Sequence, residues 1–199
     1  MVSAGSADRY LPATVQQSVK ILVAGAFGVG KTTMIGAVSE IVPLRTEETM
    51  TVASEGVDDL AGRTGKATTT VAMDFGRITL SREIALYLFG MPGQRRFWNL
   101  WDGLTEGAAG ALVLLDARRL ESSFEVLDML ELHQQALPFA VAVNHFPDTI
   151  SHPPELLRTA LDLLPGTPVV DCDARDRKSS LAALAALVQY ALTSRGDPP

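Results

Sequence analysis

The stretch GAFGVGKT, residues 25–32, decides how the rest of the sequence is interpreted. It fits the pattern G-x-x-x-x-G-K-[ST] at every fixed position, and residues 19–24 before it are almost all apolar. These features predict a buried strand, a glycine-rich turn and a helix over residues 31–41, which Pro43 stops. In such a turn, backbone N–H groups surround phosphate oxygens and the helix N-terminus adds its dipole. The stretch therefore predicts a phosphate-binding loop, or P-loop.

In the rest of the sequence, apolar segments that predict strands alternate with segments whose periodicity predicts helices. Strands are predicted over residues 71–80, 83–89, 110–115, 139–143 and 168–170, and helices over residues 122–137, 153–164 and 179–193. Ser122 and Glu125 form a predicted capping box, and the polar residues 44–70 are predicted to form a long loop of the kind that is functional or disordered. The order predicts an α/β fold with a mostly parallel sheet of about six strands, helices on both faces and one antiparallel edge strand.

The chain of 199 residues fits one domain, predicted over residues 18–195, between an arm at residues 1–17 and a tail at residues 196–199. Its net charge is −6 and it has no basic run, which argues against nucleic-acid binding. It has one cysteine, Cys172, and no signal peptide, transmembrane run or lipidation motif. These features predict a cytoplasmic protein without its own membrane anchor, which a partner could recruit to a membrane.

The P-loop supplies most of the predicted nucleotide ligands. The ammonium of Lys31 is placed for the terminal phosphates, and the hydroxyl of Thr32 for Mg²⁺. The predicted phosphate-binding set is Phe27, Gly28, Val29, Gly30, Lys31, Thr32 and Thr33.

Two further segments follow or precede strands where a γ-phosphate could be sensed. In residues 90–94, GMPGQ, the N–H of Gly93 could contact the γ-phosphate and Gln94 could orient the attacking water; the alternative is an ordinary Pro-Gly turn. A threonine among residues 68–70 could close over Mg²⁺, although threonine runs also favour the start of a strand.

Base recognition is expected after the later strands. Guanine is commonly read by Asn-Lys-x-Asp, whose carboxylate accepts two hydrogen bonds from the base. Here Asn144 fits, His145 replaces the lysine and Asp148 comes one residue late. In residues 173–175, DAR, a backbone N–H could donate to guanine O6.

These segments together resemble the Ras-like small GTPases, and more closely the bacterial MglA-type branch and the conservon GTPases of actinobacteria. The likeness spans residues 19–194 and includes TVAMDFG at residues 70–76, MPGQ at 91–94, VAVN at 141–144 and CDAR at 172–175. It implies a GTP/GDP switch that works with a roadblock-type regulator and a histidine-kinase-like sensor. The implied site is Lys31 and Thr32 on phosphate and Mg²⁺, Thr70 closing on the metal, Gln94 positioning water, and Asn144, His145, Asp148, Ala174 and Arg175 around the base.

The sequence departs from Ras-like patterns at three places. Gly90 stands where most members have an aspartate that holds a Mg²⁺-bound water, a residue that the MglA-type branch also lacks. The displaced Asp148 bears on guanine selectivity, and Thr69 stands where the MglA-type pattern has an arginine. These departures predict slow hydrolysis by the isolated chain. They leave two alternatives open: a nucleotide-binding scaffold with negligible hydrolysis, and an ATP-using P-loop protein.

Several residues carry two interpretations. Trp98 and Trp101 could pack in the core or form a partner-docking patch, and Asp116 could approach the base or cap a helix. For Cys172 the expected role is a small buried thiol, and the histidines lack metal-ligand spacing.

Overall fold

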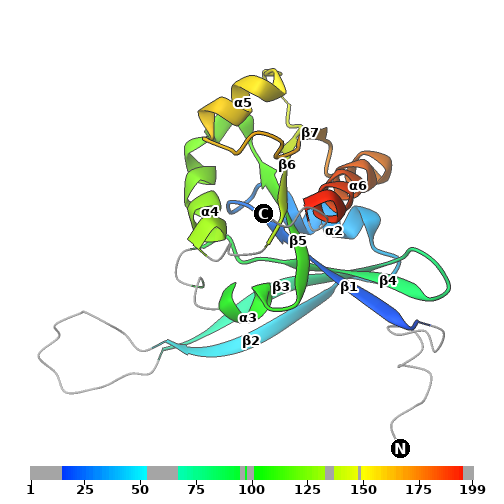
Figure 1. The fold of residues 1–199 in the computed structure, drawn as a ribbon. Coiled ribbons are helices and arrows are strands. Elements are labelled where there is room, and N and C mark those ends of the chain that lie inside the picture. The colour runs from blue at the N-terminus through cyan, green and yellow to red at the C-terminus, as the bar shows by residue number, and fades with distance from the viewer. Residues whose placement is uncertain are drawn as a thin grey trace, which may run out of the picture.

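The computed structural model describes residues 15–52, 67–94, 97, 101–132, 137–147 and 149–194. These residues form a single β-sheet with helices on both faces (Figure 1). The strands are β1 Gln17–Ala24, β2 Leu44–Val52, β3 Ala67–Thr79, β4 Ile84–Gly90, β5 Ala108–Leu115, β6 Phe139–Asn144 and β7 Val169–Cys172. The helices are α2 Lys31–Val38, α3 Trp101–Thr105, η2 Ala117–Arg119, α4 Glu121–Leu132, α5 Pro154–Ala160 and α6 Arg177–Ser194.

Within the described residues the sheet has seven strands in the order β2-β3-β4-β1-β5-β6-β7. From β4 to β7 the neighbours run parallel, whereas β3 is antiparallel to both β2 and β4. This arrangement confirms the predicted α/β fold with a mostly parallel sheet. The antiparallel strand is not at the edge, however, because β2 lies outside it.

Strand β2 is the main correction to the predicted fold. It comes from the first part of residues 44–70, predicted above as a loop, and it pairs with β3 from Leu44 opposite Phe75 to Val52 opposite Ala67. Its sequence LRTEETMTV shows no sustained apolar alternation, which is why the pattern did not indicate a strand. Threonine and valine nevertheless favour extended backbone, and pairing with β3 satisfies that backbone.

Other elements differ from prediction at their ends. Helix α4 begins at Glu121, and the hydroxyl of Ser122 donates to the carbonyl of Arg119 at 2.7 Å, so the predicted capping box at Ser122 is wrong. Helices α2 and α5 are shorter than predicted, ending at Val38 and Ala160. Such ends are set by local capping contacts that apolar periodicity does not report.

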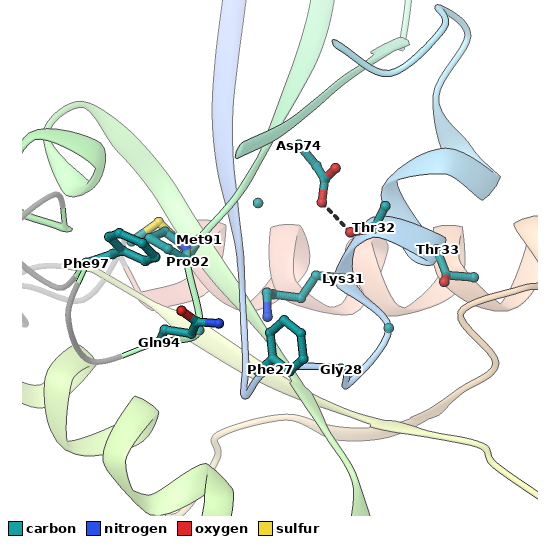
Figure 2. Close-up of a pocket in the computed structure, with 13 residues that line it drawn as sticks. Phe27, Gly28, Lys31, Thr32, Thr33, Asp74, Met91, Pro92, Gln94 and Phe97 are labelled. Carbon is teal, nitrogen blue, oxygen red and sulfur yellow. Dashed lines mark hydrogen bonds between the residues drawn. The ribbon is translucent and has the colours of Figure 1, made fainter. Parts of the chain in front are cut away.

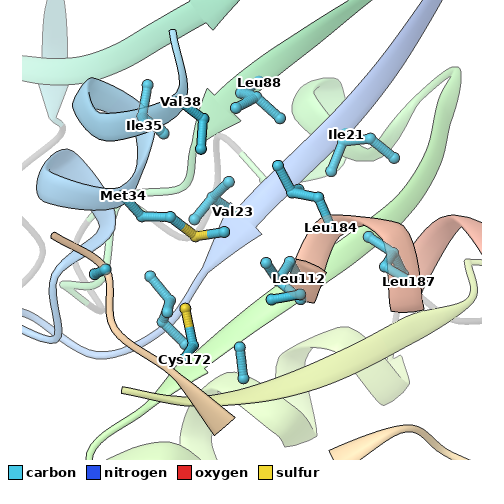
Figure 3. Close-up of a cluster of buried hydrophobic side chains, with 14 of the residues drawn as sticks. Ile21, Val23, Met34, Ile35, Val38, Leu88, Leu112, Cys172, Leu184 and Leu187 are labelled. Atoms are coloured by element: carbon cyan, nitrogen blue, oxygen red, sulfur yellow. The ribbon is translucent and has the colours of Figure 1, made fainter. Parts of the chain in front are cut away.

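Two apolar layers hold the helices against the sheet. Along β1, Ile21 and Val23 face α2 and α6, whereas Leu22 and Ala24 face α4, as the alternation of a strand requires. The first layer, shown in Figure 3, places Leu112 of β5 among residues of α2 and α6. Because both faces are covered, β6 and the carboxyl-terminal parts of β1 and β5 are buried, which explains the nearly continuous apolar sequences there.

The parallel topology brings several connecting segments to one edge of the sheet. Strands β1, β4, β6 and β7 run in one direction, so their carboxyl ends, and the segments that follow them, lie at the same edge of the sheet. In open α/β sheets, ligands bind at this edge. No helix in the described part of the chain has the length and apolarity to cross a membrane.

Removing Leu112 should show how much of the stability comes from this core. Leu112 is fully buried in β5, so Leu112→Ala should lower the free energy of unfolding by about 3 kcal/mol in urea denaturation. The matched control, Leu192→Ala, removes a side chain that is 70% exposed on α6 and should change stability by less than about 0.5 kcal/mol. Equal losses in the two variants would contradict this packing.

Candidate functional site

The loop between β1 and α2 is shaped by close backbone contacts. Gly25 has φ 138°, and a Cβ there would lie 2.5 Å from the carbonyl oxygen of Leu114. Gly30 has φ 108°, and a Cβ there would lie 2.6 Å from Nδ2 of Asn144. Larger residues at either position would push the loop away from the neighbouring strands. The glycines of the motif therefore hold the loop against β5 and β6, in the form predicted for a P-loop.

Lys31 is held at the first position of α2. Its Nζ donates to the carbonyl oxygens of Gly25 and Ala26, each at 2.8 Å. These contacts engage two of the three donors of the ammonium and fix its direction across the loop. Burial lowers the pKa of Lys31 to about 8, and the negative charge of Asp74 partly opposes that shift. The ammonium is therefore poised to gain from an anion placed beside it.

Asp74 is a site residue that the sequence analysis missed. It lies on β3, and its Oδ2 accepts a hydrogen bond of 2.5 Å from the hydroxyl of Thr32. Gly90 on the neighbouring β4 makes room for it, because a Cβ at Gly90 would lie 3.2 Å from the Cβ of Asp74. The glycine at position 90, where most Ras-like proteins have an aspartate, indicates a carboxylate supplied by a neighbouring strand.

The segment after β4 lies directly against the P-loop. A Cβ at Gly93 would lie 2.7 Å from the oxygen of Gly25 and 2.9 Å from the nitrogen of Phe27. The two segments enclose a pocket of about 480 Å³, into which Lys31 and Gln94 point (Figure 2). The pocket is lined by Phe27, Gly28, Gly30, Lys31, Thr32, Thr33, Asp74, Gly90, Met91, Pro92, Gly93, Gln94 and Phe97. The structure thus brings the P-loop and Gln94 together, as predicted.

Trp101 holds the segment after β4 through a hydrogen bond to its backbone. It is fully buried, and its indole N–H donates to the carbonyl oxygen of Pro92 at 3.3 Å. The core interpretation of Trp101 is therefore confirmed, and Trp98 lies outside the described residues.

Asn144 joins the P-loop to the segment after β7. Its Nδ2 donates to the carbonyl oxygen of Val29, and its Oδ1 accepts from the N–H of Ala174, both at 2.9 Å. Asn144 is only 4% exposed, so these bonds are shielded from water. The N–H of Ala174, predicted to meet a base, is here committed to Asn144. The predicted base contacts of both residues stay predictions.

Charged pairs stabilise the segments around Asn144. Arg175 donates twice to the carboxylate of Asp173, at 2.9 Å each, and these hydrogen bonds lower the pKa of Asp173 to about 2. His145 also lowers the pKa of Asp173, and the backbone N–H of His145 donates to the carbonyl oxygen of Cys172 at 2.7 Å. Arg175 is exposed, so its guanidinium remains accessible to a ligand. Asp148 lies outside the described residues.

Asp116 caps the short helix η2. Its carboxylate accepts from the backbone N–H of Arg118 at 3.0 Å and from two guanidinium nitrogens of the same residue at 2.9 Å. These bonds to Arg118 hold the pKa of Asp116 below its usual range. The guanidinium of Arg118 also lies 4.2 Å from the ring centre of Phe146. Of the two interpretations of Asp116, the structure supports the cap.

Thr70 lies away from the other predicted metal ligand. It belongs to β3, where its backbone pairs with Thr49, four residues before Asp74. Four residues of strand span about 13 Å, so Thr70 would need a rearrangement of β2 and β3 to approach Thr32. Its role in closing on a metal stays a prediction.

The sequence matches the family described as "conserved hypothetical ATP binding protein" over residues 23–194. The chain belongs to this family. The match covers the P-loop, Asp74, Gln94, Asn144 and Ala174, so the whole pocket lies within it. An uncharacterized protein of Methanocaldococcus jannaschii is 28% identical over 131 residues, which is 65% of this chain and 71% of that protein.

Solved structures of other proteins have the same fold as this chain. The Arl6 small GTPase of Trypanosoma brucei, solved with the nucleotide analogue GppNp, aligns with a TM-score of 0.61 and 17% identity, covering 91% of this chain and all of that one. The G domain of the FeoB iron transporter of T. maritima aligns with a TM-score of 0.56 and 19% identity, covering 88% and 99%. The chain therefore has the fold of Ras-like small GTPases.

Removing the Asn144 side chain should destabilise the P-loop and the segment after β7, which it joins. Asn144→Ala would leave the buried carbonyl of Val29 and N–H of Ala174 unpaired, so we expect a loss of about 2 kcal/mol or more in unfolding free energy. Asn144→Asp keeps the acceptor for Ala174 but loses the donor to Val29, and should also destabilise. Gln189→Ala, at an exposed position on α6, is the control and should have little effect.

The pKa of Lys31 predicts how phosphate binding depends on pH. A bound phosphate favours the ammonium and raises its pKa, so affinity is fully present below about 8 and falls as pH rises through that value. We expect fluorescent-nucleotide titrations to show binding about tenfold weaker at pH 9 than at pH 7. Lys31→Arg, which stays charged, is the control for titration of the nucleotide itself. A profile as steep as that of the wild type in this variant would contradict the assignment to Lys31.

Proposed function

We propose that this protein is a GTP/GDP switch with slow intrinsic GTP hydrolysis. The observation that carries the proposal is that Lys31, Thr32, Asp74 and Gln94 line the same pocket. Lys31 would hold the terminal phosphates, and the amide of Gln94 would orient a water for attack on the γ-phosphorus. That attack breaks the bond to the β-phosphate oxygen and releases GDP and phosphate. Nucleotide binding in general agrees with the family to which the chain belongs.

We propose Mg²⁺ as the accompanying ion. The hydroxyl of Thr32 and the carboxylate of Asp74 are oxygen ligands of the kind Mg²⁺ prefers, and their mutual hydrogen bond places them together. Thr32 would bind the ion directly, and Asp74 would hold a water of its shell. Bound Mg²⁺ neutralises charge on the phosphate oxygens, and the phosphates and waters supply its other ligands.

Two observations bear on the base in different directions. The similar solved proteins include GTPases by their printed names, which favours GTP. The family description names ATP, and the N–H of Ala174 is committed to Asn144 in this structure, so an ATP-using protein is the second candidate. We propose GTP preference with limited discrimination, in which Asp148 reads the base.

The biological setting is proposed from the sequence resemblance alone. A MglA-type or conservon GTPase would act in the cytoplasm of a bacterium, within a multicomponent signalling system. A roadblock-type regulator and a histidine-kinase-like sensor would be its partners. Without measurable hydrolysis, the same nucleotide-dependent contacts would make the protein a scaffold.

Nucleotide competition tests the proposed function directly. Unlabelled GTP should displace a fluorescent GTP analogue more effectively than ATP does, and Asp148→Ala should narrow that difference. Lys31→Ala should lose nearly all binding, because no ammonium then offsets the phosphate charge. Equal competition by ATP and GTP would favour the second candidate, and unchanged binding by Lys31→Ala would contradict the P-loop assignment.

Turnover by the isolated chain should be slow. Gln94 can position water, but slow rates of about 10⁻⁴ to 10⁻² s⁻¹ are typical of switches without a well-placed arginine. Phosphate release from pre-bound GTP measures this rate, and Gln94→Leu should lower it further. Turnover near about 1 s⁻¹ without a partner would show a complete site and refute the expectation.

A further inference from the structure

The segment after β6 is held by a side chain that comes from the end of β5. Arg118, in η2, stacks on the ring of Phe146, with its guanidinium carbon 4.2 Å from the ring centre. Its Nη1 also donates to the carbonyl oxygen of Pro147 at 3.4 Å. A cation–π contact and a hydrogen bond therefore join Arg118 to two successive residues that are distant from it in the sequence.

Asp116 fixes the direction of this guanidinium. Nε of Arg118 donates to Oδ1 of Asp116 and Nη2 donates to Oδ2, each at 2.9 Å, so one edge of the guanidinium is paired with both carboxylate oxygens. Asp116 is only 1% exposed, and the pair is therefore anchored in the protein interior. Because a bidentate pair resists rotation, the flat face and the remaining nitrogen of Arg118 stay directed at the segment after β6.

The segment that Arg118 contacts is also tied at its two sides. The N–H of Phe146 donates to the hydroxyl oxygen of Thr149, and the N–H of Thr149 donates to the carbonyl oxygen of Phe146, both at 3.1 Å. One residue earlier, the backbone bond from His145 to Cys172 joins the segment to β7. Arg118 supplies the support on the opposite side, because β5 and β7 flank β6 in the sheet.

We infer that Arg118 is a positioning residue that sets base selectivity by holding Phe146 and Pro147 in place. The inference rests on the proposed function and specifies how its base is selected, since Asp148, proposed above to read the base, follows Pro147 in the sequence. Hydrogen bonds weaken steeply when their distance or angle departs from the optimum. A small shift of this segment therefore costs base selectivity more than it costs phosphate binding, and Arg118 takes no part in hydrolysis.

The ratio of GTP affinity to inosine triphosphate (ITP) affinity tests this role. ITP lacks only the 2-amino group of guanine, so the ratio reports recognition of that base edge and cancels the phosphate contacts. Competition against a fluorescent nucleotide gives the ratio for wild type, Arg118→Lys, Arg118→Met and Phe146→Leu. We expect wild type to prefer GTP by about tenfold or more, and each variant to lose most of that preference while its ITP affinity changes by less than about twofold.

A double variant distinguishes positioning through the ring from a general loss of structure. If Arg118 acts through Phe146, then Arg118→Met combined with Phe146→Leu lowers the ratio no further than either change alone. Phe146→Tyr keeps a ring for the guanidinium and should hold the ratio within about twofold of wild type. Arg118→Met leaves the buried carboxylate of Asp116 without this partner, so Arg118→Lys and Phe146→Leu decide the question if that variant does not fold.

Arg119→Met is the matched control. Arg119 donates to the same carboxylate at 3.3 Å from a side chain that is 51% exposed, and its removal should leave the ratio unchanged. An unchanged ratio in the Arg118 and Phe146 variants, additive effects in the double variant, or equal losses of GTP and ITP affinity would overturn the positioning role and leave the switch intact. Equal binding of GTP and ITP by wild type would also overturn it, because no selectivity then exists to be positioned. Failure of wild type to bind GTP would refute the switch as well.

Discussion

The buried amide of Asn144 is the contact on which the site edge depends. It accepts from the segment after β7 and donates to the P-loop, and so joins three segments that are distant in sequence. Because Asn144 is shielded from water, breaking either bond would leave a backbone group without solvent compensation. The hydrogen bond from Asn144 to Val29 ties the glycine-dependent curve of the P-loop to β6. Phosphate geometry is thereby coupled to the segments that would surround a base.

A second constraint comes from the close approach of Asp74 on β3 to Gly90 on β4. A carboxylate on β4 would be a short step from the P-loop, yet that position is glycine and the carboxylate lies on β3. Adjacent strands lie about 4.8 Å apart, so a side chain on one can fill space left open on the other. This makes the pairing of β3 with β4 part of the site. Any shift in that register would move Asp74 away from Thr32.

Charge and burial explain why the pocket favours an anion. Burial lowers the pKa of Lys31 to about 8. The negative charge of Asp74 and the carbonyl oxygens of Gly25 and Ala26 are the groups that stabilise its ammonium. A phosphate would complete that environment.

The sequence alone determined the P-loop, the alternation of strands and helices, the placement of Gln94 after a strand and that of Asn144 at the end of one. Those features are local, because a motif and the apolar segments that flank it are close together in the sequence. Strand β2 needed tertiary pairing with β3, since LRTEETMTV lacks an apolar period. The partnership of Thr32 with Asp74 and the commitment of Ala174 to Asn144 were likewise decided by the fold. Both contacts join residues far apart in sequence, and only the strand order and register bring their atoms within hydrogen-bonding distance.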